Sequence, residues 1–165
     1  MSKYIDKYEF KVAPKEVKYY DDDPLKLNNN FQFFHNKNKF RKDLNNLQYL
    51  IKDYLKIALH APGIRDSYIN QEYTESSLIL IFTTPDMIHN ANKIFETCER
   101  EIGLGCYYVK TTSEYIFLKA NDMKGMRAGL DVLYEIFKQT LEDYFNQKKF
   151  EDYIKIRPFE IYSCT

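Results

Sequence analysis

The clearest pattern of apolar and polar positions lies between residues 107 and 141. Two short runs at 107–110 and 115–118 are rich in aromatic and β-branched residues, and the polar residues 111–114 separate them, which predicts a β-hairpin. After residue 122 the period changes, because apolar residues recur at steps of three and four. This spacing predicts a helix with one apolar face, formed by Met126, Leu130, Leu133, Phe137 and Leu141.

The start of this helix carries two further signals. Asn121 and Asp122 have side-chain oxygens that can accept hydrogen bonds from the free N–H groups of the first turn. Gly125 and Gly129 lie one turn apart, and each costs about 1 kcal/mol of helix propensity relative to alanine. Two glycines in this arrangement predict a helix face that approaches a sheet closely. A phosphate site would instead require a glycine-rich loop before the helix, and Ala120-Asn121-Asp122 is not one.

Other segments predict further strands. Alternating residues at 8–12 predict a half-buried strand, and the unbroken apolar run at 78–82 predicts a central strand buried on both faces. Residues 21–30 are rich in turn formers, and residues 64–76 are polar and aperiodic, which indicates a loop. Additional short strands are expected at 16–20, 31–34 and 153–156.

Two other segments have helical spacing. Apolar residues from Phe40 to Ala58 recur at steps of three and four until Ala61-Pro62-Gly63, which predicts a long helix. A shorter amphipathic helix is expected between Met87 and Cys98. We therefore predict one α/β domain, with a mixed sheet of about five to seven strands and two long helices packed on one face.

The 107–141 segment resembles the end of the small domain that precedes the catalytic barrel in β-N-acetylhexosaminidases. Related domains precede the barrels of α-glucuronidases and O-GlcNAc hydrolases. The family pattern is a hydrophobic hairpin, an Ala-x-Asp-like turn and a helix that opens Gly-x-x-x-Gly with leucine four positions on. Residues 12–17 are similar to the family's opening strand. The residues that carry the motif here are Asn121, Asp122, Gly125, Gly129, Leu130 and Leu133.

This resemblance implies a domain organisation. Residues 1–156 would form one accessory domain, and residues 157–165 would begin a linker or a first strand toward a catalytic domain that this chain does not contain. The family's catalytic Asp-Glu pair lies on that barrel. Arg157-Pro158-Phe159 matches only part of the phrase in which the family places a sugar-contacting arginine. Because Arg157 precedes the proline and no arginine follows Phe159, we assign it no sugar-binding role.

Composition favours a folded domain that does not bind nucleic acid. The chain has 165 residues, 44% of them hydrophobic, with 12 Phe and 15 Tyr. Such a chain buries roughly 70% of the surface that it exposes when unfolded, and its aromatic content is unlike that of a disordered chain. Lys and Arg balance Asp and Glu at 24 each. Since a nucleic-acid binder concentrates basic charge on one face, we expect no such partner.

The cysteines and the hydropathy bear on the compartment. The three cysteines, Cys98, Cys106 and Cys164, are odd in number and contain no Cys-x-x-Cys pair, which indicates lone thiols or a reducing compartment. The sequence has neither a signal peptide nor an apolar run of about 20 residues that could span a membrane. We expect a soluble protein without a membrane partner, cytoplasmic or, if a leader has been removed, secreted.

The sequence lacks recognisable catalytic, cofactor and metal motifs. No nucleophile motif accompanies the histidines, and neither a Walker loop nor a dinucleotide fingerprint occurs. The acidic residues 21–23 lack the spacing of a calcium loop and indicate a solvated turn. Zinc binding by scattered His and Cys stays open, but it would need ligands from several separate segments. We assign no catalytic, cofactor-binding or metal residue and no cofactor; the histidines are His35, His60 and His89.

Three functional hypotheses follow. The first is a non-catalytic accessory domain of a glycoside hydrolase, which buttresses a (β/α)8 catalytic barrel in cis. The alternative is a free-standing carbohydrate- or protein-binding module with surface tyrosines as stacking platforms. A small enzyme with an unrecognised site is the third and has no constellation of residues in its favour. Under the first hypothesis the isolated domain exposes a surface that is normally buried, which allows a homodimer.

Overall fold

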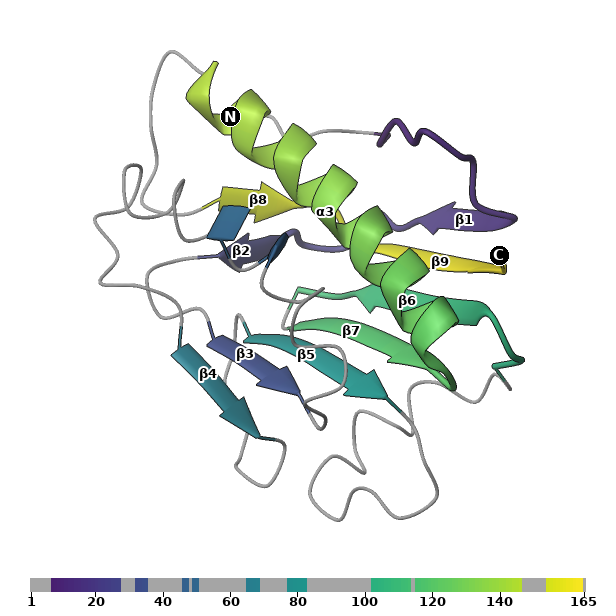
Figure 1. The fold of residues 1–165 in the computed structure, drawn as a ribbon. Helices are drawn as coiled ribbons and strands as arrows, with labels where there is room; N and C mark the ends of the chain where they lie inside the picture. The colour runs from purple at the N-terminus through teal and green to yellow at the C-terminus, as the bar shows by residue number, and fades with distance from the viewer. Residues whose placement is uncertain are drawn as a thin grey trace.

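The computed structural model describes residues 7–27, 32–35, 46–47, 49–50, 65–68, 77–82, 102–113, 115–146 and 154–164. These residues form a seven-stranded mixed sheet, a separate two-stranded sheet and one long helix, α3, which lies across one face of the larger sheet (Figure 1). The elements are β1 (Glu16–Tyr19), β2 (Leu25–Leu27), β3 (Gln32–His35), β4 (Arg65–Tyr68), β5 (Ser77–Phe82), β6 (Cys106–Thr111), β7 (Tyr115–Ala120), α3 (Met123–Phe145), β8 (Ile154–Ile156) and β9 (Phe159–Cys164).

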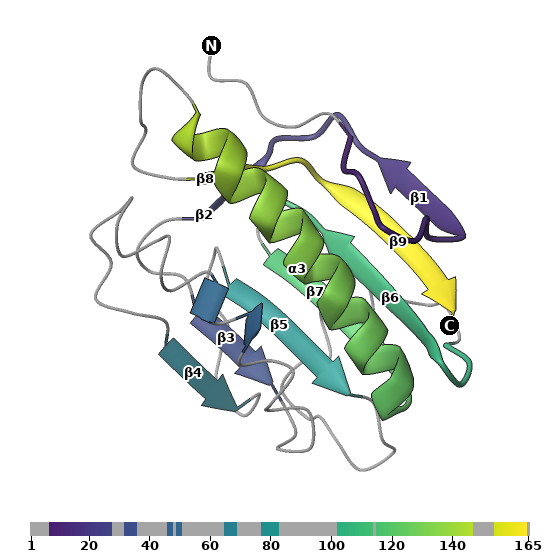
Figure 2. The same cartoon turned by 45° about the horizontal axis from the view of Figure 1, so that its top comes forward.

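The larger sheet has the strand order β1-β9-β6-β7-β5-β3-β4. Its β4, β3, β5 and β7 strands are parallel to one another, whereas β6, β9 and β1 each pair antiparallel with their neighbours. The small sheet pairs β2 with β8 antiparallel, and it lies near the C-terminal end of α3 (Figure 2). The mixed sheet and the helix place the domain in the α/β class.

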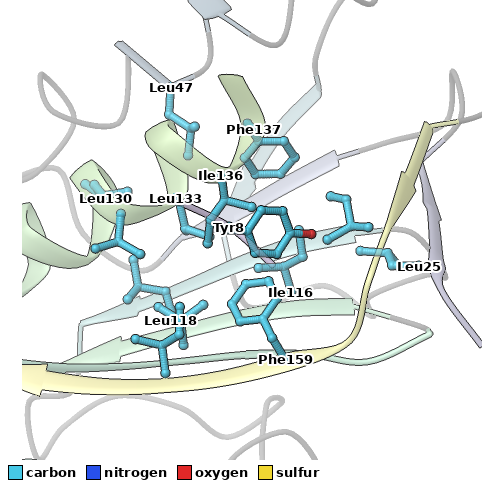
Figure 3. Packing of buried hydrophobic residues seen from close by; sticks show 14 of the residues in the cluster. Tyr8, Leu25, Leu47, Ile116, Leu118, Leu130, Leu133, Ile136, Phe137 and Phe159 are labelled. Atoms are coloured by element: carbon cyan, nitrogen blue, oxygen red, sulfur yellow. The ribbon is translucent and has the colours of Figure 1, made fainter. Parts of the chain in front are cut away.

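The predicted hairpin and helix are both confirmed. The strands β6 and β7 pair antiparallel, and α3 begins directly after Asp122. The apolar stripe of α3 packs on β6, β7 and β8 and forms the core together with inward-facing strand residues (Figure 3). Fully buried side chains in this core include Ile116, Leu118, Leu133, Phe137 and Phe159.

The prediction of two long helices on one face is only partly within the described residues. Residues 46–47 and 49–50 are helical, and Leu47 is buried in the same core cluster as Leu130 of α3 (Figure 3). The rest of that expected helix, from 38 to 61, lies outside the described residues. The shorter helix expected between Met87 and Cys98 also lies outside them.

The prediction of a strand at residues 8–12 is wrong, and the structure gives the reason. The backbone of Glu9 pairs with a side chain instead of a strand: its N–H donates to Oε1 of Gln139 at 2.8 Å, and Nε2 of Gln139 donates to its carbonyl at 2.7 Å. The alternation reflects real burial, because Tyr8 is 6% exposed and packs edge-on against Phe159. Residues 7–15, which we call the strap, lead into β1 (Figures 1 and 2).

Two strands were not predicted at all. Residues 65–68, expected to be a loop, form β4 beside β3, and residues 25–27, within the expected turn region, form β2 beside β8. The alternation in β2, Leu-Lys-Leu, is only three residues long, and β4 has no apolar alternation, so each strand depends on a partner that is distant in sequence. The expected strands at 16–20, 77–82 and 153–156 are confirmed as β1, β5 and β8, and β3 overlaps the one expected at 31–34.

The C-terminal strand lies inside the sheet. The strand β9 pairs with β6 on one side and with β1 on the other. The expected domain boundary at residue 156 precedes β9, and the sheet includes residues up to Cys164. Without β9 the strand β1 would have no pairing partner among the described strands, so residues 159–164 are part of this folding unit.

Candidate functional site

The motif predicted at the start of α3 is a capped junction between helix and sheet. The carboxylate of Asp122 accepts two hydrogen bonds, from the Gly125 N–H at 2.8 Å and from the Gly105 N–H at 2.9 Å. The side-chain amide of Asn121 donates to the carbonyl of Ile102. Gly105 has φ of 71°, a conformation that glycine adopts without strain. These bonds join the first turn of α3 to the turn that precedes β6.

The two glycines of the motif lie where the helix approaches the sheet most closely. A Cβ on Gly125 would lie 2.1 Å from the carbonyl oxygen of Cys106. A Cβ on Gly129 would lie 2.5 Å from Cδ1 of Leu118. The sequence prediction of close helix packing therefore has a direct geometric basis, which is stronger at Gly125 because the obstacle there is backbone.

The other two motif residues pack in the core. Leu130 is 2% exposed and Leu133 is fully buried, and both face the sheet (Figure 3). All six predicted residues thus serve capping or packing in the structure.

The cysteine prediction is wrong for two of the three residues. Cys106 and Cys164 form a disulfide, and they lie directly opposite each other in the pairing of β6 with β9. An odd number of cysteines does not exclude one disulfide, and which two cysteines meet depends on the long-range register of β6 with β9. Cys98 lies outside the described residues. Disulfides persist in oxidising compartments, so this disulfide removes the argument for a reducing compartment that the odd number of cysteines gave.

One carboxylate of the sheet is held in a hydrogen-bonded cluster. Glu160 on β9 accepts hydrogen bonds from the hydroxyl groups of Tyr20 and Tyr108. Burial would raise the pKa of Glu160, but these two bonds and the nearby Lys110 and Lys18 outweigh it and hold the pKa below its usual value. The bond to Glu160 raises the pKa of Tyr20 to about 12. Glu160 is therefore ionised at neutral pH and is unsuited to act as a general acid.

Arg157 contacts residues at the end of β1 and just after it. Its guanidinium carbon lies 5.1 Å from the ring centroid of Tyr19, and its Nη2 lies 3.0 Å from Oδ1 of Asp21. The ion pair is a weak contributor because Asp21 is 98% exposed. Arg157, which lies between β8 and β9, therefore connects this turn to the end of β1 through its contacts with Tyr19 and Asp21.

Within the part of the chain that the structure describes, no group of three or more His, Cys, Asp or Glu could hold a metal ion. His35 lies on β3, whereas His60 and His89 lie outside the described residues. In the described part of the chain, no helix is long and apolar enough to cross a membrane.

The surface of α3 is flanked by two hollows. The larger, of about 570 Å³, lies between α3 and the strap, and we call it the strap hollow. The smaller, of about 450 Å³, lies between α3 and the helical residues 46–47 and 49–50. Tyr134 and Asp131 line both. The sequence did not predict these hollows. The local signal for them was the pair of acidic residues, Asp131 and Glu135, on the side of α3 that lines the strap hollow. The strap hollow is lined by Lys11, Val12, Ala13, Tyr107, Ala128, Asp131, Val132, Tyr134, Glu135, Ser163 and Cys164.

Comparison with known proteins finds likeness in structure but not in sequence. No protein-family model matches the chain, and no curated protein matches it. Its structure is similar to CpGH84D, with a TM-score of 0.61 and 16% identity over 97% of this chain and 24% of that one. It is also similar to CpGH84B, with a TM-score of 0.59 and 14% identity over 95% of this chain and 22% of that one.

A third neighbour is the GH20 β-N-acetylhexosaminidase of Streptomyces coelicolor A3(2). The TM-score is 0.55 with 13% identity, over 92% of this chain and 25% of that one. At such identities the likeness shows the fold alone. The chain spans about a quarter of the length of the solved chains that it matches. It therefore has the fold of a domain that occurs within these larger glycoside hydrolase chains.

Proposed function

We propose that this chain is a non-catalytic accessory domain of a larger glycoside hydrolase, in which it buttresses a (β/α)8 catalytic barrel. The observation that carries the proposal is the coverage of the structural matches. They include 92–97% of this chain but only 22–25% of the larger chains. A domain that is matched almost whole inside a hydrolase several times its size is expected to have its catalytic part elsewhere in the polypeptide.

The packing and hydrogen bonding of the described residues support a structural task for the domain. The helix–sheet junction uses its polar groups for capping, and the buried part of the described chain is occupied by apolar packing. The carboxylate in the most developed hydrogen-bonded cluster, Glu160, is ionised and is held by two tyrosine hydroxyls. These features stabilise a rigid body, which is what a buttressing domain requires.

The direct test is the size of the native gene product. An antibody raised against this chain would be used to probe a lysate of the source cells after electrophoresis. We expect a band several-fold heavier than the 19.8 kDa of this chain. A band at 19.8 kDa would overturn the proposal and would bring forward the alternative of a free-standing carbohydrate- or protein-binding module.

A second test addresses the non-catalytic role separately. The isolated chain would be incubated with aryl N-acetylglucosaminides and aryl glucuronides, and release of the aryl alcohol would be followed. We expect no turnover above the buffer control. Turnover that follows the chain through purification would contradict the non-catalytic role even if the native product were large.

A further inference from the structure

The strap hollow has a wall built from one face of α3. Ala128, Asp131, Val132 and Glu135 are spaced three and four positions apart, so they lie on the same side of the helix and face the strap. The opposite wall is the strap itself, which Gln139 holds through its two hydrogen bonds to Glu9. The helix wall is part of the packed α3, and hydrogen bonds at Glu9 and Lys15 hold the strap wall on either side of the hollow.

The floor of the hollow carries hydroxyl groups. Tyr107 is 4% exposed and Ser163 is 7% exposed, and they are direct neighbours across the pairing of β6 with β9. Their side chains are hydrogen-bonded to each other, and Oγ of Ser163 also accepts from the Lys15 N–H at 3.1 Å. The floor is therefore part of the hydrogen-bonded sheet, next to the Cys106–Cys164 disulfide.

The rim combines an aromatic ring with carboxylates. Tyr134 is 37% exposed and Val12 is 82% exposed, which makes them two of the few large hydrophobic side chains that the described residues leave exposed. Asp131 and Glu135 flank Tyr134 on α3, and Oε1 of Glu135 lies at 3.4 Å from the Lys11 N–H, a long hydrogen bond.

We propose that the strap hollow binds a saccharide unit. The C–H face of a sugar ring would pack on Tyr134, and its hydroxyl groups would donate to the carboxylates of Asp131 and Glu135, since hydroxyl-to-carboxylate hydrogen bonds are among the stronger ones. A volume of about 570 Å³ lies within the range of small-molecule sites. The two carboxylates beside an exposed aromatic ring are the feature that favours a polyhydroxylated ligand. This site does not depend on whether a catalytic barrel is present in the same polypeptide.

The test is an NMR titration of the full 165-residue chain with methyl β-glucoside, N-acetylglucosamine and lactose. We expect saturable shifts at the amides of residues 11–13 and 128–135 with at least one sugar. The variants Tyr134→Ala and Asp131→Asn should weaken that binding about tenfold or more while leaving the spectrum of the core unchanged. Both side chains lie on the surface of α3, so the fold should survive.

The matched control is Tyr49→Ala, which removes another exposed tyrosine that lines only the smaller hollow. It should bind the sugar as the wild-type chain does. Absence of saturable shifts with all three sugars, or an equal loss in Tyr49→Ala, would overturn the proposal. Shifts at the same amides that depend on protein concentration and vanish in Tyr134→Ala would also overturn it, because they would show that a second copy of the chain occupies the hollow.

Discussion

The two glycines of α3 allow a quantitative test of how closely the helix approaches the sheet. In the variant Gly125→Ala the new methyl group would lie 2.1 Å from the carbonyl oxygen of Cys106 and 2.9 Å from its carbonyl carbon. No side-chain rotation relieves this contact, because the obstacle is the backbone of β6. The helix would have to move away from the sheet, and the cap between Asp122 and Gly105 resists that movement.

The expected magnitude is a balance of two opposing effects. Overpacking a core costs about 1–3 kcal/mol, and a clash with backbone lies at the upper end of that range. Replacement of glycine by alanine in a helix returns about 1 kcal/mol of propensity. Gly125→Ala should therefore lose about 2 kcal/mol of unfolding free energy, which corresponds to a fall in Tm of about 4–8 °C for a chain of this length.

Gly129→Ala is the comparison variant. Its methyl group would meet Cδ1 of Leu118 at 2.5 Å, which is the far end of a flexible side chain. A shift of this side-chain end relieves the contact without moving backbone, so the overpacking cost should be smaller than at Gly125 and the gain in propensity should nearly offset it. We expect Gly129→Ala to lie within about 1 kcal/mol of the wild-type stability.

Urea unfolding followed by circular dichroism measures all the variants, with the m-value as the check that unfolding remains two-state. Lys138→Ala and Lys138→Gly, at an exposed position of the same helix, calibrate the difference in propensity. A Gly125→Ala variant as stable as the wild type, or no less stable than Gly129→Ala, would refute the argument, because it would show that the helix does not press on the backbone of β6.

Three further predictions concern other parts of the sheet. Reduction of the Cys106–Cys164 disulfide, which closes a separation of 58 residues, should lower the unfolding free energy by about 4 kcal/mol; identical urea midpoints with and without a dithiol reductant would contradict this. Thr111→Val should stabilise the chain by about 1 kcal/mol, because the buried Thr111 hydroxyl has no hydrogen-bond partner in the described structure; a loss of stability would show that this hydroxyl is satisfied. Because the pKa of Glu160 is lowered in the folded chain, its contribution to the free energy of unfolding is present above the unfolded pKa and is lost as the pH falls through the folded pKa. Tm should therefore fall in acid, and Glu160→Gln should make that fall smaller; a pH profile of Tm unchanged by Glu160→Gln would exclude this cluster as the cause. The pKa of Tyr20, raised to about 12, adds a loss of stability only above about pH 10.

Local sequence signals predicted the hairpin and the helix. The strands β2 and β4 and the disulfide depend on pairing between segments that are distant in sequence. The cap at Asp122 and the apolar stripe of α3 lie within one continuous segment, so the residues alone define them. The disulfide depends on β9 returning to pair with β6 across a separation of 58 residues, and no local pattern contains that register. The strap shows the opposite failure. Its alternation is genuine, but Gln139 takes the backbone bonds that a neighbouring strand would have made.

The same long-range placement explains why the candidate binding site could not be predicted. The strap hollow joins Val12 of the strap, Asp131 and Tyr134 of α3, and Ser163 of β9. Asp131 and Tyr134 were unremarkable in the sequence, because polar and aromatic residues are normal on the exposed face of a surface helix. Only the position of the strap turns that face into one wall of a hollow.

The helix α3 therefore separates two kinds of function on its two sides. Its sheet-facing residues, such as Gly125 and Leu133, are packed so closely that substitutions there should change stability, and would change ligand binding only by disturbing the fold. Tyr134 and Asp131 lie on the opposite side, where substitutions should change binding at nearly constant stability. Measuring both quantities for both sets of variants distinguishes a domain that only supports a larger enzyme from one that also recognises a sugar, since only the second predicts a loss of binding without a loss of stability.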